Sequence, residues 1–277
     1  MDAVTPDIRL VAVDMDGTLL DGDGNVPEPL WEMLPRLAER GVSFVPASGR
    51  QLATLRATFG EAADAMTFIA ENGAYVVRAG VEVASDALDP AILGRAVRHL
   101  RSLGAQGYDL GVVVCGKRSA YIERTDEAFR REASTYYAAL EAVDDVLAVD
   151  DDVLKIAVYD FAVAEESVGR ALDDIARTHR VVVSGRHWVD IMNPGVDKGV
   201  ALRRLQDALG VTPAQTAAFG DYLNDLEMLD AAHWSYAMAN AHPEVAARAR
   251  HRAPSNTEHG VLTTIEALLA EAPAPTA

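Results

Sequence analysis

The sequence contains a single cysteine, Cys115, and few basic residues relative to its acidic ones. One cysteine forms no internal disulfide, which favours a reducing compartment. Lysine and arginine number 25 against 42 aspartates and glutamates, so the formal net charge is -17. Because nucleic acids and anionic membranes bind positive surfaces, this charge argues against both as partners. A small anionic substrate remains compatible, since a metal ion, a lysine and backbone N–H groups can reverse the potential inside one cleft.

Long apolar runs and targeting signals are also absent from the sequence. No stretch approaches the roughly 20 apolar residues that cross a bilayer, and "MDAVTPDIRL" has no basic region followed by an apolar run. We therefore expect a cytoplasmic protein. The 277 residues, 49% hydrophobic and 24% charged, suffice for one large or two moderate globular domains. The sequence leaves monomer and homodimer both open.

Apolar runs typical of strands alternate with segments of helical period in both terminal parts of the chain. This alternation predicts an α/β fold with a mostly parallel sheet. In chain order the expected elements are strand 9–14, helix 27–40, an apolar run at 42–50, helix 51–60, a third apolar run at 67–77, helix 198–210, strand 216–221 and helix 223–232, followed by shorter α/β elements through residue 241.

The alternation of strand and helix patterns changes between residues 83 and 190, where closely spaced pairs of apolar runs indicate hairpins. This part predicts an α+β domain with an antiparallel sheet, inserted into a core formed by residues 1–82 and 191–277. Its expected elements are helix 90–104, strands 111–116 and 119–124, helix 127–143, strand 153–161, helix 164–179 and strands 180–185 and 187–192.

Two aspartates one residue apart follow the first buried run, in "VAVDMDGTLL". Asp14 and Asp16 repel each other at such a spacing, and a metal cation is the obvious compensation. Other polar residues also fall at element junctions: Ser48 in "VPASGR", Lys198 in "DKG" and Asp221 in "FGDYLND". Ligands of open α/β sheets bind beyond the carboxyl ends of the strands, so these junctions are expected to converge on one cleft.

These four motifs, in this order, resemble those of the haloacid dehalogenase (HAD) superfamily, and specifically its Cof-type phosphatases. The segments "ENGA" at 71–74 and "MANAHPEV" at 238–245 are similar to Cof-type sequence as well. The resemblance covers nearly the whole chain and is weakest in the insertion. It implies a Rossmann-like core, a C2-type α+β cap inserted after "ENGA", and a phosphatase that acts on a small phosphorylated metabolite.

The resemblance also assigns roles, and each agrees with the chemistry of phosphate monoesters. Asp14 is expected to attack phosphorus and form an aspartyl-phosphate, while Asp16 protonates the leaving alcohol and later activates water. Lys198 balances the charge of the transition state. Magnesium would be held by the Asp14 carboxylate, the Asp16 carbonyl and Asp221, because Mg²⁺ prefers oxygen ligands.

The remaining residues of the motifs are expected to hold the phosphate or to support those that do. The phosphate contacts are assigned to Met15 through its backbone amide, Ser48, Gly49, Lys198 and Asn224. Thr18 is expected to steady the loop by a local hydrogen bond, and Asp225 to anchor Lys198 or a metal-bound water.

Substrate specificity is expected to come from the inserted domain, where four residues lie at or near predicted hairpin turns. They are Arg118, Arg124, Arg186 and His187. Each also has an ordinary interpretation as a solvated surface residue of an acidic protein. The sequence alone does not choose among sugar phosphates, nucleotides and cofactor phosphates.

Two other functions stay open at this point. A phosphotransferase or phosphomutase would pass the phosphoryl group to another alcohol instead of water. A catalytically silent module would bind phosphoesters without turnover, but it would need neither a nucleophile nor an acid. A dehalogenase is disfavoured, because a magnesium-type acidic motif is superfluous for displacing a halide from carbon.

Overall fold

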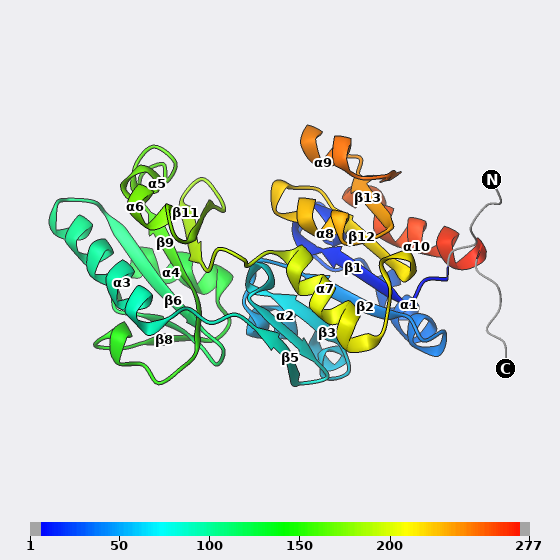
Figure 1. The fold of residues 1–277 in the computed structure, drawn as a ribbon, viewed down its shortest axis with the longest axis horizontal. Helices are drawn as coiled ribbons and strands as arrows, with labels where there is room; N and C mark the ends of the chain where they lie inside the picture. The colour runs from blue at the N-terminus through cyan, green and yellow to red at the C-terminus, as the bar shows by residue number, and fades with distance from the viewer. Residues whose placement is uncertain (1–6, 272–277) are drawn as a thin grey trace. The chain divides into compact units, whose positions relative to one another are not determined.

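The computed structural model describes residues 7–271, which form two compact units (Figure 1). Of the described residues, the first unit takes 7–49, 58–84 and 197–271, and the second takes Arg50–Ala57 and Ser85–Val196. No helix within residues 7–271 is long and apolar enough to cross a membrane. The α/β core and the inserted α+β unit confirm the predicted fold class.

The first unit is built on an eight-stranded sheet in the order β14-β13-β12-β1-β2-β3-β4-β5. The strands from β14 to β3 pair in parallel, and β4 is antiparallel to β3. β1 lies between β2 and β12, so their carboxyl ends are neighbours at one edge of the sheet. The bounds are β1 Leu10–Asp14, β2 Ser43–Ala47, β3 Thr67–Ala70, β4 Tyr75–Arg78, β5 Val81–Ser85, β12 Thr216–Gly220, β13 Trp234–Met238 and β14 His251–Ala253.

Helices cover both faces of this sheet. Leu10 and Ala12 of β1 belong to a buried cluster with Leu202 and Leu205 of α7, which lies in front of the sheet in Figure 1. On the opposite face Phe68 packs against Phe59, whose ring meets Trp31 of α1. Side chains alternate across a strand, so β1 is buried on both faces, as its apolar run predicts. The helices of this unit are α1 Pro29–Glu39, α7 Lys198–Leu209, α8 Leu226–Asp230, α9 Pro243–Arg248 and α10 Gly260–Glu271, while α2 Leu52–Phe59 begins in the second unit and ends in the first.

The second unit contains a six-stranded sheet in the order β10-β11-β9-β6-β7-β8. Its strands pair antiparallel except for β7 and β8. Residues of α3 pack with those of α5 and α6 in one buried cluster, and Phe129 of α4 belongs to another. The bounds are α3 Pro90–Ala105, β6 Leu110–Gly116, β7 Ala120–Ile122, α4 Glu127–Tyr136, β8 Leu140–Ala142, β9 Val153–Asp160, α5 Val168–Ala171, α6 Asp173–Ala176, β10 Arg180–Val183 and β11 Trp188–Met192.

The prediction of one helix over residues 127–143 is wrong, because the helix ends at Tyr136 and β8 follows. The side chain of Gln51 both donates to the Ala139 carbonyl (2.9 Å) and accepts from its N–H (3.1 Å). Thr54 accepts from the N–H of Ala138 at 3.1 Å. These bonds engage backbone groups that a continued helix would use internally, which explains why it stops.

Two further predicted elements are interrupted. Helix 164–179 is split into α5 and α6, and the Asp160 carboxylate accepts the N–H of Val168 at the start of α5. The run over residues 67–77 forms two antiparallel strands, β3 and β4, which are joined by the turn Glu71–Gly73. This turn lies at the same edge of the sheet as the carboxyl ends of β1 and β2.

Candidate active site

The four motifs lie at the carboxyl edge of the first unit's sheet. Asp14 is the last residue of β1, Ser48 follows β2, and Asp221 follows β12. Lys198 is the first residue of α7, whose N-cap Asp197 accepts the N–H of Val200 at 2.7 Å. Because β1 is flanked by β2 and β12, residues about 200 positions apart in the chain meet here.

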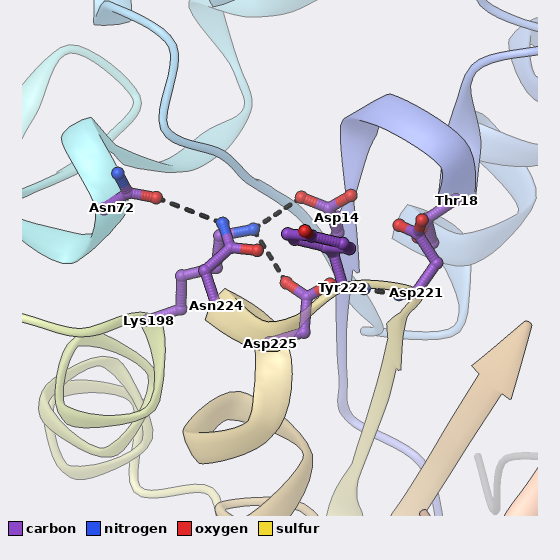
Figure 2. A network of polar contacts seen from close by, with 8 residues as sticks. All are labelled: Asp14, Thr18, Asn72, Lys198, Asp221, Tyr222, Asn224 and Asp225. Atoms are coloured by element: carbon purple, nitrogen blue, oxygen red, sulfur yellow. Dashed lines mark hydrogen bonds and ion pairs between the residues drawn. The ribbon is translucent and has the colours of Figure 1, made fainter. Parts of the chain in front are cut away.

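Lys198 lies at the centre of a buried ionic network (Figure 2). Its ammonium donates to Asp14 Oδ1 at 2.5 Å and to Asp225 Oδ1 at 2.8 Å. The Lys198 and Asp225 residues are 0% exposed and Asp14 is 7% exposed, so the network is removed from bulk water. Such charges are tolerated in an interior only when they are paired and hydrogen-bonded, as they are here.

The network shifts the pKa values of its members. Burial lowers the pKa of Lys198, but the charges of Asp14 and Asp225 outweigh burial and raise it above its ordinary value, so this side chain is a permanent cation. Burial, together with the charge of Asp225, raises the pKa of the Asp14 carboxyl, and the Lys198 ammonium opposes that rise. Burial is also the main cause that raises the pKa of Asp221 to about 6.

Asp225 acts within the network as a structural link. Its Oδ1 accepts from Lys198, and its Oδ2 accepts the N–H groups of Asp221 (3.0 Å) and Tyr222 (3.2 Å). Both carboxylate oxygens are therefore engaged by donors of the chain. The sequence analysis expected Asp225 to anchor Lys198 or a metal-bound water, and its part in the reaction stays a prediction.

Asp221 is placed beside the first motif by two residues of the turn Met15–Leu19. Thr18 Oγ1 donates to Asp221 Oδ1 at 2.8 Å, a contact with a residue 203 positions away rather than the local hydrogen bond expected for Thr18. Gly17 has φ +78°, and a Cβ at this position would lie 2.4 Å from Asp221 Oδ2. Any other residue would therefore displace the carboxylate.

One carboxylate oxygen each of Asp14, Asp221 and Asp225 lie within 4.8 Å of one another, a group that could hold a metal ion. Carboxylate oxygens are the hard ligands that suit Mg²⁺. Both oxygens of Asp225 accept hydrogen bonds from the chain, whereas Asp14 and Asp221 accept the Lys198 and Thr18 hydrogen bonds through Oδ1 alone, so these two carboxylates are the candidates for a cation.

The other predicted residues lie around this cluster. Asp16 is exposed in the turn after β1, whereas Met15 is buried. Ser48 is buried at the end of β2, with Gly49 next to it. Asn224 Nδ2 donates to Asn72 Oδ1 at 3.2 Å, as Figure 2 shows.

Three asparagines that the sequence analysis did not select support the site. Asn72 contacts Asn224, Asn240 Nδ2 donates to the Gly17 carbonyl (2.8 Å), and Asn256 Nδ2 donates to the Leu20 carbonyl (2.9 Å). Asn72 and Asn240 lie in "ENGA" and "MANAHPEV", so the resemblance of these segments was the available signal. Asn256 had no such signal.

The four residues proposed for specificity have different surroundings in the second unit. The Arg124 guanidinium pairs with Asp109 and Asp126 and lies 4.6 Å from the ring centroid of Phe161. His187 Nδ1 donates to the carbonyls of Asp160 and Ala162.

The two other arginines keep exposed side chains. Arg118 is 66% exposed, with its Nε 3.6 Å from the buried Asp151 carboxylate, and Arg186 is exposed as well. Arg124 and His187 are thus engaged within the unit. A part in specificity stays a prediction for all four residues.

The match to known proteins agrees with this geometry. Residues 11–265 match the family model of the haloacid dehalogenase-like hydrolases. The chain belongs to this family, and it is a phosphoric monoester hydrolase.

Individual relatives extend the match over both units. The chain is 36% identical to the 5-amino-6-(5-phospho-D-ribitylamino)uracil phosphatase YbjI of Escherichia coli, covering 95% of this chain and 96% of that protein. It is 30% identical to the HMP-PP phosphatase of Cronobacter sakazakii, covering 88% of each. Among solved structures, SMU.1108c from Streptococcus mutans has a TM-score of 0.83 at 28% identity, covering 95% of this chain and 99% of that one.

Proposed function

We propose that this protein is a magnesium-dependent phosphatase that hydrolyses a small phosphorylated metabolite, a sugar phosphate or a cofactor phosphate, through an aspartyl-phosphate on Asp14. The buried contact of Asp14 with Lys198, beside the carboxylate of Asp221, carries the proposal. It supports the proposal because the carboxylates of Asp14 and Asp221 and the ammonium of Lys198 lie within one cluster. The 36% identical relative named for a phosphoribityl substrate supports this substrate class.

In the first step an Asp14 carboxylate oxygen attacks phosphorus, and the bond from phosphorus to the leaving oxygen breaks. Asp16 donates its proton to that oxygen, so a neutral alcohol leaves and Asp14 carries the phosphoryl group. In the second step Asp16 accepts a proton from water, whose oxygen attacks phosphorus. Inorganic phosphate leaves and the Asp14 carboxylate is restored.

The phosphoryl oxygens are held by the chain during both steps. Lys198 contributes a positive charge, while the Ser48 hydroxyl, the Met15 and Gly49 N–H groups and the Asn224 amide donate hydrogen bonds. Asp14, the Asp16 carbonyl and Asp221 would hold Mg²⁺, which supplies positive charge to phosphate and nucleophile when bound. Thr18 and Asp225 keep Asp221 and Lys198 in place.

The two units have separate parts in this proposal. The first unit is the catalytic core, and the second is a cap that determines which leaving group is accepted, with Arg118 and Arg186 as its exposed cationic side chains. We place the enzyme in the cytoplasm, where the buried thiol of Cys115 stays reduced. Its partners are small metabolites rather than nucleic acids or membranes.

The direct test is phosphate release from a panel containing sugar phosphates, nucleotides, pyridoxal phosphate, HMP-PP and 5-amino-6-(5-phospho-D-ribitylamino)uracil, with Mg²⁺ or with chelator. We expect release that requires Mg²⁺ and is fastest with sugar or cofactor phosphates. Transfer of phosphate to a second alcohol without net release would instead show a phosphotransferase. Binding of a phosphate mimic without either reaction would show a silent binding module.

Magnesium is expected to stabilise the metal-free protein against heat. At a Mg²⁺ concentration of about 100 times its dissociation constant, binding to the folded state contributes about 2.7 kcal/mol. Since the pKa of Asp221 is raised to about 6, this carboxyl takes up a proton as the pH falls through that value, and the proton competes with the cation. The rise in the unfolding midpoint should therefore be larger at pH ~7.5 than at pH ~5.

The matched variant for this measurement is Asp221→Asn, which removes the carboxylate but keeps an oxygen that can accept from Thr18. We expect Mg²⁺ to leave its unfolding midpoint nearly unchanged at both pH values. An equal rise in the variant and the wild-type protein would show that the cation binds elsewhere.

A further inference from the structure

The turn Glu71–Gly73 has an unusual backbone conformation next to the proposed active site. Its three residues all have positive φ: +52° for Glu71, +55° for Asn72 and +101° for Gly73. Side chains disfavour this left-handed region, although asparagine tolerates it better than most residues. Such conformations persist where surrounding contacts hold them, and they cluster at functional sites.

Asn72 contacts two of the loops that carry the expected phosphate ligands. Its N–H donates to the Ser48 carbonyl at 3.0 Å, and its Oδ1 accepts from Asn224 Nδ2 at 3.2 Å. A Cβ at Gly49 would lie 3.0 Å from both Nδ2 and Oδ1 of Asn72. The amide of Asn72 therefore lies against the loop after β2 and bonds to the loop after β12.

The neighbouring Gly73 brings the turn against a third segment of the site. A Cβ on Gly73 would lie 2.3 Å from the Asp197 carbonyl oxygen and 3.1 Å from the Lys198 nitrogen. The absence of a side chain thus allows the turn to touch the first residues of α7. One short turn contacts the segments that present Ser48, Lys198 and Asn224.

We propose that Asn72 is a positioning residue, which orients the Asn224 amide and holds the Ser48–Gly49 loop against it for phosphoryl transfer. This inference rests on the proposed function. With Asn224 Nδ2 directed at Asn72, as Figure 2 shows, the amide of Asn224 has one orientation. Hydrogen-bond donors held in this way need not reorganise when the transition state forms. Their loss should therefore weaken binding of the transition state more than binding of phosphate.

The decisive variant is Asn72→Gly, because glycine accepts φ +55° without strain and removes only the side chain. We expect its thermal unfolding midpoint to equal or exceed that of the wild-type protein, while kcat falls at least about 10-fold, the scale of a misplaced catalytic group, with a smaller change in KM. Orthovanadate, which mimics the transition state, should bind at least about 10-fold more weakly by calorimetry, and inorganic phosphate less than about 3-fold more weakly.

Ala79→Gly is the matched control, since Ala79 also has a positive φ, +46°, but lies in the turn between β4 and β5. This turn is at the opposite edge of the sheet, where the Ala79 N–H donates to Met66 just before β3. The control should keep the wild-type kcat and vanadate affinity. A loss of activity in Ala79→Gly equal to that in Asn72→Gly would overturn the proposal.

A double-mutant cycle with Asn224→Ala tests the route of the effect. If Asn72 acts through Asn224, Asn72→Gly should lower kcat and vanadate affinity less in the Asn224→Ala protein than in the wild type. Fully multiplicative losses, equal weakening of phosphate and vanadate, or a wild-type kcat in Asn72→Gly would each overturn the inference. Absence of phosphate release by the wild-type protein would overturn the proposed function instead, because vanadate binding is measured without substrate.

Discussion

Replacement of Asp14 by asparagine is expected to abolish hydrolysis, with a fall in kcat of about 10⁴-fold or more, the scale seen when a covalent nucleophile is removed. The amide nitrogen and oxygen of asparagine cannot form the phosphorylated intermediate. The substitution keeps the shape of a residue that is buried at the end of β1 and removes a charge that burial disfavours. The variant should therefore fold, and circular dichroism with phosphate-release kinetics checks both statements.

Detection of the phosphorylated intermediate distinguishes the role of Asp14 as nucleophile from that of Asp16 as acid–base residue. With p-nitrophenyl phosphate, whose leaving group departs without a proton from Asp16, mass spectrometry of the Asp16→Asn protein after brief reaction should show one added phosphoryl group, because hydrolysis of the intermediate lacks its base. Asp14→Asn should show none. Asp207→Asn, on the exposed side of α7, is the matched control and should keep wild-type kinetics. Turnover by Asp14→Asn within ten-fold of wild type would exclude Asp14 as the nucleophile.

The second large effect is expected for Lys198→Met, which keeps a long side chain but removes the charge. The carboxylates of Asp14 and Asp225 would then stay buried without their cation, and breaking a buried pair in this way costs about 3 to 5 kcal/mol. Urea unfolding of the metal-free protein measures the loss. The surface variant Arg36→Met, which breaks the exposed pair with Glu266, should unfold as the wild type does.

The loss in Lys198→Met should depend on pH. The Lys198 ammonium lowers the pKa of the Asp14 carboxyl, so without it that pKa rises further in the folded state, and the folded protein holds a proton that the unfolded chain releases at neutral pH. The deficit should therefore shrink as the pH falls toward the unfolded value of about 3.9.

A second substitution tests the cause of the instability. Adding Asp225→Asn to Lys198→Met removes one of the two buried carboxylates that have lost the ammonium. This should restore part of the free energy of unfolding. A double variant that is less stable than Lys198→Met alone would show that the lost contacts of Asp225 with the loop after β12 matter more than its charge.

Within the first unit, the sequence was sufficient where a motif is contiguous and sits on a buried strand. Asp14 to Thr18 form one turn after β1, and Asp221 to Asn224 follow β12, so local spacing already places their side chains together. The apolar runs of β1 and β12 identify parallel strands buried on both faces. The sheet order then brings both turns to one edge, as the α/β pattern predicts.

The sequence was insufficient where distant segments compete with local preference. The helical pattern of residues 127–143 is cut at Tyr136 because Gln51 and Thr54, more than 80 residues earlier, bond to the backbone that follows. Arg124 looked available at a hairpin turn, yet Asp109 and Asp126 occupy its guanidinium. No spacing rule reveals such partners, because each contact forms only when the chain has folded.

The sequence by itself determined the fold class, which follows from strand and helix periodicity, and the family, which follows from the resemblance of its motifs to those of known proteins. Only the tertiary structure showed how the charges are paired, with Lys198 between two buried carboxylates. Only it showed that the turn at Asn72 bonds to Asn224, 152 residues away. The physical reason is that hydrogen bonds and ion pairs depend on positions within a fraction of an ångström, which packing sets and local sequence does not.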